Sequence, residues 1–148
     1  MLQSRPTALK FLVLLSFLAV GCSRDVPETK TSPPAPQVDP IAAAEEQVKK
    51  QNTPEAYLNL SLVYYNAQDF QLCIDAAKTA LQMRPSYAEA FNNIAAAQIM
   101  LGDYDAAITN ATQAVRISPE TQLYKNNLAR AQREKAAKKE QAAKSATK

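Results

Sequence analysis

Two cysteines, Cys22 and Cys73, carry the most reactive side chains in this chain of 148 residues, and no histidine accompanies them. Histidine is the commonest general base and the commonest metal ligand, so neither a Cys-His nor a Ser-His nucleophile can form. The two cysteines also lack the paired spacing of a zinc site. We therefore predict no enzyme activity, no metal and no cofactor.

Cys22 follows an apolar run from Phe11 to Val20, which is flanked by the basic residues Lys10 and Arg24. A run of about ten residues is half of what a membrane-spanning helix needs. A positive segment, a short apolar core and small residues before a cleavage point are typical of a secretory signal peptide. We therefore predict a signal peptide at residues 1–21, with an internal apolar helix as the alternative.

The residues that lead to this cysteine resemble the lipobox of bacterial lipoproteins. They read Leu-Ala-Val-Gly-Cys at 18–22. The resemblance implies that the Cys22 thiol is diacylated, that the chain is cut between Gly21 and Cys22, and that the new amine is acylated. Two or three acyl chains anchor a protein stably to a membrane. Ser23 implies sorting to the outer membrane, so we expect the mature chain in the cell envelope, facing the periplasm.

Residues 22–40 start with the acylated cysteine and continue as a proline-rich segment without large apolar side chains other than valine. Such a composition buries too little surface to offset the entropy of ordering. We interpret it as a tether between membrane and domain, with a proline-rich partner ligand as the alternative. The formal net charge of +3 comes mostly from the C-terminal end, so no basic face favours nucleic-acid binding.

The rest of the chain contains an internal repeat with an offset of 34 residues. Residues 54–87 and 88–121 are identical at eight aligned positions. Apolar residues recur at helical spacing in each unit, and a proline closes each unit. Gly102 before Asp103 separates two helices in the second unit, so each unit is predicted to be a helical hairpin. Gln68 replaces that glycine in the first unit, at a cost of about 1 kcal/mol if the turn is left-handed.

This period and pattern resemble the tetratricopeptide repeat (TPR) family. Tyr57 and Phe91 match its aromatic opening, and Ala80 and Ala114 match a small residue of its second helix. Cys73 matches another small position, which implies a core role. The resemblance implies an all-α fold, a TPR helical-hairpin array (an α-solenoid) of about two full repeats plus a capping helix.

Further helices are predicted on both sides of the repeats. Residues 41–52 follow Asp39 as N-cap and Pro40 in the first turn, and we expect a short helix that covers the open side of the first repeat. A third unit begins after the second repeat and then becomes polar all round. It predicts a capping helix at 122–138 and a disordered basic tail at 139–148.

In the TPR family, the first helices of the units line a concave face that binds extended peptides or partner helices. Carried over by position, the resemblance implies the partner-binding residues Leu58, Asn59, Leu62, Tyr65, Asn93, Ala96, Ile99, Asn127 and Arg130. The recurring asparagine either bonds a bound peptide or joins adjacent repeats. The basic positions of the family's carboxylate clamp fall on Leu58 and Leu123, so that clamp does not carry over. A groove occupied by the N-terminal helix is the alternative to an open face.

These features together predict a membrane-anchored adaptor or assembly factor that binds a protein or peptide partner without catalysis. The alternative is a structural homo-oligomer of the cell envelope that pairs through the apolar groove face. Both predictions place the interaction surface on the first helices of the repeats.

Overall fold

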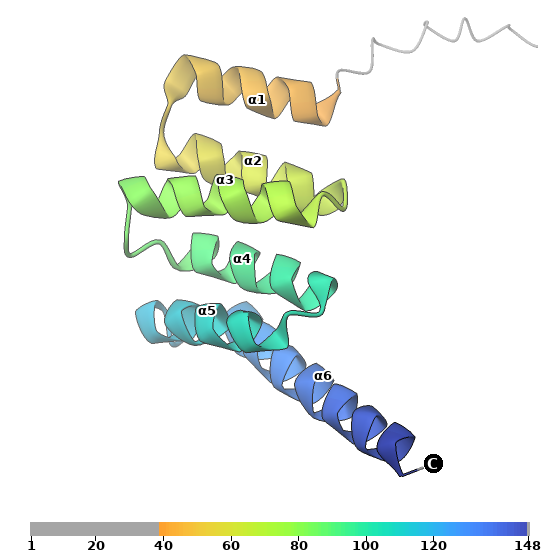
Figure 1. Ribbon diagram of the computed structural model, residues 1–148. Helices are drawn as coiled ribbons and strands as arrows, with labels where there is room; N and C mark the ends of the chain where they lie inside the picture. The colour runs from red at the N-terminus through yellow and green to blue at the C-terminus, as the bar shows by residue number, and fades with distance from the viewer. Residues whose placement is uncertain (1–38, 148) are drawn as a thin grey trace, which may run out of the picture. The chain divides into compact units, whose positions relative to one another are not determined.

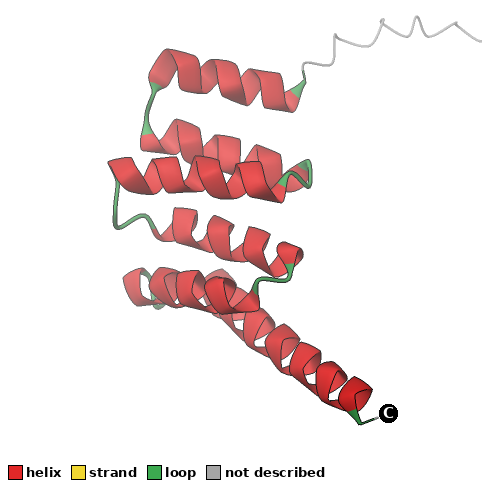
Figure 2. Ribbon diagram, viewed as in Figure 1, coloured by secondary structure: helices red, strands yellow, loops and turns green. Residues whose placement is uncertain are grey.

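The computed structural model describes residues 39–147, and every regular element in that range is an α-helix (Figure 1, Figure 2). The helices are α1 (Pro40–Gln51), α2 (Pro54–Asn66), α3 (Phe70–Met83), α4 (Ala88–Leu101), α5 (Tyr104–Ile117) and α6 (Gln122–Ala146). The predicted all-α fold class is therefore confirmed. The predicted signal peptide, Cys22 and nearly all of the predicted tether lie outside the described residues.

The described helices form two hairpins with one further helix on each side (Figure 1). α2 packs on α3 and α4 packs on α5, which gives one hairpin for each sequence repeat. α3 contacts α4, and α5 contacts α6, so the stack is continuous. α4 also contacts α2 and α6. The first helices of successive units therefore share one face of the stack.

Side-chain caps mark the starts of α1, α2 and α5. Asp39 Oδ1 accepts a hydrogen bond from the Ile41 amide at 3.0 Å, and Thr53 Oγ1 accepts one from the Ala56 amide at 3.2 Å. A proline follows each of these two caps, at the first helical position, where a backbone N–H would have no intrahelical hydrogen-bond acceptor. Asp103 Oδ1 caps α5 by accepting a hydrogen bond from the Ala106 amide. These starts set the face that each helix presents to its neighbours.

Small side chains fill the contacts between the helices, which allows their axes to approach closely. The side chains with 0% exposure are Ser61, Cys73, Ala77, Ala80, Ala90, Ala95, Ala97, Ala107, Ala111, Ala114 and Ala131. Burial raises the pKa of the Cys73 thiol to about 11. The thiol therefore stays protonated at neutral pH, where a thiol is a poor nucleophile. The predicted core role of Cys73 is confirmed.

α1 closes the N-terminal side of the stack by packing on α2. Ile41, Ala44 and Val48 lie against the core of the first hairpin, and the Tyr64 hydroxyl donates to Glu45 Oε1 at 2.7 Å. Among the described helices, α1 contacts α2 alone. It occupies the place that the second helix of a preceding repeat would take. The alternative in which this helix fills the groove is therefore wrong.

The C-terminal helix is longer than the sequence predicts. We expected a capping helix at 122–138 and a disordered tail at 139–148, whereas α6 continues without a break to Ala146. Alanine, lysine, glutamine and glutamate are strong helix formers, and Glu140 and Lys144 form an i,i+4 ion pair at 2.6 Å. Local helix propensity therefore extends the helix where an apolar face is missing.

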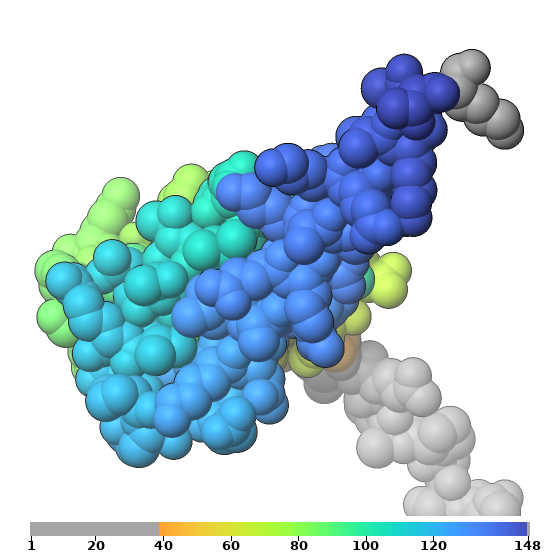
Figure 3. Space-filling view, turned by 90° about the horizontal axis from the view of Figure 1, so that it is seen from below, coloured from red at the N-terminus to blue at the C-terminus, as the bar shows by residue number. Residues whose placement is uncertain are grey.

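Two lysines of α6 also contact the turn between α4 and α5 and the first residues of α5. Lys135 pairs with Asp105, and Lys138 Nζ donates to the Gly102 carbonyl at 3.3 Å and lies 5.5 Å from the centroid of the Tyr104 ring. Beyond these contacts α6 runs past the last hairpin (Figure 1, Figure 3). None of the described helices, α6 included, is both long and apolar enough to cross a membrane.

The turns inside the two hairpins offer a matched test of backbone strain. Gln68 and Gly102 hold the equivalent turn position, with φ of +67° and +75°. We expect Gln68→Gly to raise the free energy of unfolding by about 1 kcal/mol, because glycine adopts this conformation without a steric conflict. Urea unfolding followed by circular dichroism measures the change.

Gly102→Gln is the reciprocal control for this prediction. A Cβ added at Gly102 meets no atom within 4 Å, so only the backbone conformation opposes the substitution. We expect the free energy of unfolding to fall by about 1 kcal/mol. An unchanged unfolding midpoint in Gln68→Gly, beside a lowered one in Gly102→Gln, would contradict the equivalence of the two turns.

Candidate functional site

A cleft of about 410 Å³ opens on the shared face of α2, α4 and α6. Its lining residues are Glu55, Leu58, Asn59, Leu62, Tyr87, Glu89, Asn92, Asn93, Leu123 and Tyr124. They belong to the first helices of the three successive units, apart from Tyr87, which directly precedes α4. The cleft therefore crosses the stack where the sequence predicts a partner.

Leucine side chains give the cleft its exposed apolar surface. Leu62 exposes 48% of its surface and Leu123 exposes 57%, and Leu58 is half-buried. The largely buried rings of Tyr87 and Tyr124 complete the apolar part of the lining. Single exposed leucines are ordinary on protein surfaces, but several that line one open hollow are typical of an interaction site.

The three recurring asparagines all bond to the preceding unit of the stack. Their side-chain amides donate as follows: Asn59 to Gln47 Oε1 at 3.1 Å, Asn93 to Ser61 Oγ at 2.9 Å, and Asn127 to Asn92 Oδ1 at 2.8 Å. Ser61 is fully buried, and its hydroxyl donates in turn to the Leu58 carbonyl at 2.6 Å. Of the two explanations that the sequence left open, these contacts favour hydrogen bonding between repeats.

The charged residues of the cleft lie in the first turns of α2 and α4. Glu55 is paired with Arg84, whose guanidinium carbon lies 4.4 Å from the centroid of the Tyr87 ring. Backbone hydrogen bonding and the Arg84 side chain lower the pKa of Glu55. Glu89 takes part in no ion pair within residues 39–147. The cleft lining thus holds two carboxylates and no lysine or arginine.

Four of the nine partner-binding residues that the resemblance implied line the cleft, namely Leu58, Asn59, Leu62 and Asn93. Four others lie outside the lining. Tyr65 packs edge-to-face on Phe70 at 5.6 Å, and Arg130 donates to Met100 Sδ at 3.5 Å. Ala96 and Asn127 are half-buried on α4 and α6. The cleft is therefore confined to the N-terminal and middle parts of the first helices.

The ninth residue, Ile99, is a core residue, and its assignment to the groove was wrong. It exposes only 4% of its surface and packs with Ala107 and Ala131 of α5 and α6. Tyr104, the first residue of α5, is packed against the same cluster. Ile99 stands close to the hairpin turn, where the second helix folds back over the end of the first.

Sequence reasoning missed the two tyrosines of the cleft. Tyr87 precedes α4 and therefore falls outside the helical pattern. Tyr124 occupies the position at which the two full repeats carry Ala56 and Ala90. An aromatic residue at a position that is otherwise alanine was a signal that could have identified it.

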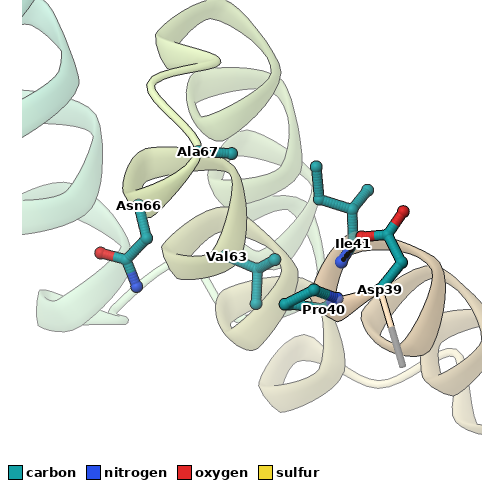
Figure 4. A pocket seen from close by; sticks show the side chains of 6 residues that line it. All are labelled: Asp39, Pro40, Ile41, Val63, Asn66 and Ala67. Atoms are coloured by element: carbon teal, nitrogen blue, oxygen red, sulfur yellow. Dashed lines mark hydrogen bonds between the residues drawn. The ribbon is translucent and has the colours of Figure 1, made fainter. Parts of the chain in front are cut away.

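Another hollow of about 410 Å³ lies between the start of α1 and the end of α2 (Figure 4). Its lining residues are Asp39, Pro40, Ile41, Val63, Asn66 and Ala67. Its one charged lining residue, Asp39, already caps α1. Within the described range, no three acidic or cysteine side chains gather in a group that would hold a metal ion.

The tetratricopeptide repeat family model matches residues 52–120 of this chain. No curated protein sequence matches this chain. The match covers both hairpins from just before α2 to just after α5.

Solved structures share the fold at low sequence identity. The first TPR domain of the human RPAP3 protein is 18% identical, with a TM-score of 0.64, over 68% of this chain and 80% of that one. The second TPR domain of human RPAP3, in complex with the HSP70 peptide SGPTIEEVD, is 16% identical, with a TM-score of 0.59, over 62% and 78%. A MamA protein is 23% identical, with a TM-score of 0.60, over 68% and 55%.

The family match and the shared fold agree with the hairpin geometry and the 34-residue period. Residues 52–120 are therefore similar to the tetratricopeptide repeat family, and the two hairpins at residues 54–121 form a TPR-like helical-hairpin array.

Proposed function

We propose that this chain is a membrane-anchored, non-catalytic adaptor or assembly factor that binds a segment of a protein partner in the cleft. The observation that carries the proposal is the open cleft itself, in which Leu62 and Leu123 remain exposed beside the half-buried Leu58. Covering these side chains with a partner removes apolar surface from water. The second RPAP3 domain, which shares the fold, was solved with a bound peptide.

A displayed library of random dodecapeptides tests the binding role. The full-length chain is the bait, and selected peptides are then synthesised with a fluorescent label for anisotropy measurements. We expect selected peptides to compete with one another for one site and to lose affinity when the cleft leucines are replaced. Peptides that bind equally well to a chain with an altered cleft would overturn the proposal.

The anchor is a separate part of the proposal, and it rests on the sequence around Cys22. We expect Cys22→Ser to move the chain from the membrane fraction to the soluble fraction, because no acyl chain can then attach. Mass spectrometry of the mature N-terminus and fractionation of cells measure the change. Cys73→Ala is the matched control and should leave the chain in the membrane fraction. Unchanged membrane attachment in Cys22→Ser would exclude the lipid anchor.

A second copy of the chain is the alternative occupant of the cleft. The outer ends of the stack are polar, since α1 exposes Glu46 and Lys50, and α6 exposes its charged C-terminal half. The exposed leucines of the cleft would offer a second copy an apolar surface. Light scattering of the purified chain over a range of concentrations tests this, and a mass that stays at one chain removes the alternative.

A further inference from the structure

In the first repeat, Arg84 lies between a carboxylate and an aromatic ring. Arg84 pairs with Glu55 of α2, and its guanidinium stacks over the Tyr87 ring at 4.4 Å. A carboxylate beside an aromatic face is a favourable environment for a planar guanidinium. The N-terminal end of the cleft therefore shows, within one chain, how a cation is held there.

The second repeat presents the same carboxylate without the arginine. At the 34-residue offset, Glu89 corresponds to Glu55, whereas Ser118 stands where the first repeat has Arg84. Both glutamates are exposed and lie in the first turn of their helices. Among residues 39–147, no lysine or arginine pairs with Glu89.

Tyrosine rings lie beside this carboxylate as well. Tyr87 and Tyr124 line the same cleft as Glu89. Burial raises the pKa of each tyrosine, and the charge of Glu89 adds to the rise in both, which is the effect expected of a carboxylate close to each phenol. The carboxylate of Glu89 thus lies in a cleft with two aromatic rings, which come from the end of the first repeat and from α6, and no cation of the described residues pairs with it.

The charge of the cleft decides between classes of partner. Its two charged lining residues are glutamates, and one of them is already neutralised by Arg84. An acidic segment such as SGPTIEEVD, the peptide bound by the second RPAP3 domain, would bring like charge toward Glu89. A segment with a basic residue would bring opposite charge to the same place.

We propose that the cleft binds a partner segment that places an arginine or lysine against Glu89 and apolar side chains over Leu62 and Leu123. The inference rests on the proposed binding function and specifies the chemistry of the partner. The bound cation takes the position at Glu89 that Arg84 takes at Glu55. The apolar side chains that flank the cation in the partner segment supply the contact area. The pairing of the cation with Glu89 determines how the segment is positioned along the cleft, and so determines its specificity.

The test uses peptides from the dodecapeptide selection and charge-swapped versions of them. We expect the selected peptides to be enriched in arginine or lysine between apolar residues and depleted in aspartate and glutamate. Glu89→Lys should weaken the binding of a selected basic peptide at least tenfold. The same variant should bind the peptide's Arg→Glu version at least tenfold more tightly than the original chain does. Labelled peptides and anisotropy measure both effects.

Two further variants distinguish a loss of binding caused by the changed charge at Glu89 from one caused by a folding defect. Glu89→Gln removes the charge with little change in shape, and it should weaken the basic peptide several-fold while the unfolding midpoint stays close to that of the original chain. Glu140→Lys makes the same charge change as Glu89→Lys, but on the exposed C-terminal half of α6, outside the cleft lining. It should alter peptide affinity by less than twofold.

The outcomes separate this inference from the proposed function. Peptides that require the cleft leucines but bind Glu89→Lys as tightly as the original chain would overturn the inference and leave the binding function standing. Selected peptides rich in acidic residues would overturn it as well. A selection in which no peptide depends on the cleft leucines would overturn both.

Discussion

Replacing Leu62 and Leu123 together by glutamate is expected to weaken the binding of a selected peptide by at least a hundredfold without unfolding the chain. The two side chains belong to α2 and α6, at opposite sides of α4, and they expose about half of their surfaces in the free chain. They contribute little to the core and are available to a partner.

The size of the effect follows from apolar burial. Burying one fully exposed leucine side chain stabilises a complex by about 1.5–3 kcal/mol. A partner would cover the exposed half of each of these two leucines, and that half contributes part of this free energy. Glutamate adds a second cost, because its carboxylate would be desolvated under the partner without a bonding group. A loss of about 3 kcal/mol over two positions corresponds to roughly a hundredfold in affinity, since 1.4 kcal/mol is a factor of ten. Anisotropy titration with a labelled peptide measures it.

Leu72→Glu with Leu101→Glu is the matched control. These two leucines are exposed to about the same degree as the first pair, and neither lines the cleft. The control carries the same change in charge and hydropathy, so a general effect of added carboxylates would appear in both double variants. Equal loss of binding in the two would contradict the cleft as the site. Equal circular dichroism spectra establish that both variants are folded.

The period, the N-cap of α1 and the turn within each hairpin were accessible from the sequence because each depends on local chemistry. A spacing of 34 residues, a proline at the end of each unit and acidic or hydroxyl caps are properties of neighbouring residues. The left-handed turn at Gln68 followed from the same alignment, since Gly102 stands at the equivalent position. The structure describes a helical hairpin for each unit.

The contacts of the cleft were less accessible because they depend on how helices pack. The position of an asparagine on a first helix leaves its partner open, and the hydrogen bond from Asn93 to Ser61 crosses between two units. Tyr87 was missed because it lies between helices, outside any periodic pattern. The free carboxylate of Glu89 becomes visible only when the ion pair of Arg84 with Glu55 is seen beside it.

The length of α6 shows a different limit. Residues 139–148 have no apolar face, a pattern that predicts disorder. Tertiary packing supplies most helix stability in proteins, but long runs of alanine, lysine and glutamate form helices by propensity and side-chain pairs. The ion pair of Lys135 with Asp105 lies shortly before this segment and joins α6 to α5.

Ile99→Ala is expected to lower the free energy of unfolding by about 2–5 kcal/mol, as isoleucine-to-alanine changes in protein cores do. Ile99 exposes 4% of its surface and packs with Ala107 and Ala131, so it joins α4, α5 and α6. The two alanines are too small to move into the space that the lost side chain would leave. Because domains of this size are stable by only about 5–15 kcal/mol, the change is large.

Met100→Ala is the control for this prediction, since Met100 is the next residue of α4 and exposes 44% of its surface. We expect it to change the free energy of unfolding by less than about 0.5 kcal/mol. Urea unfolding compares the two variants, and peptide titration under native conditions supplies a second measurement. Ile99→Ala should keep its peptide affinity as long as it is folded. A stable Ile99→Ala chain that has lost peptide binding would return Ile99 to the groove and extend the cleft toward the hairpin turn.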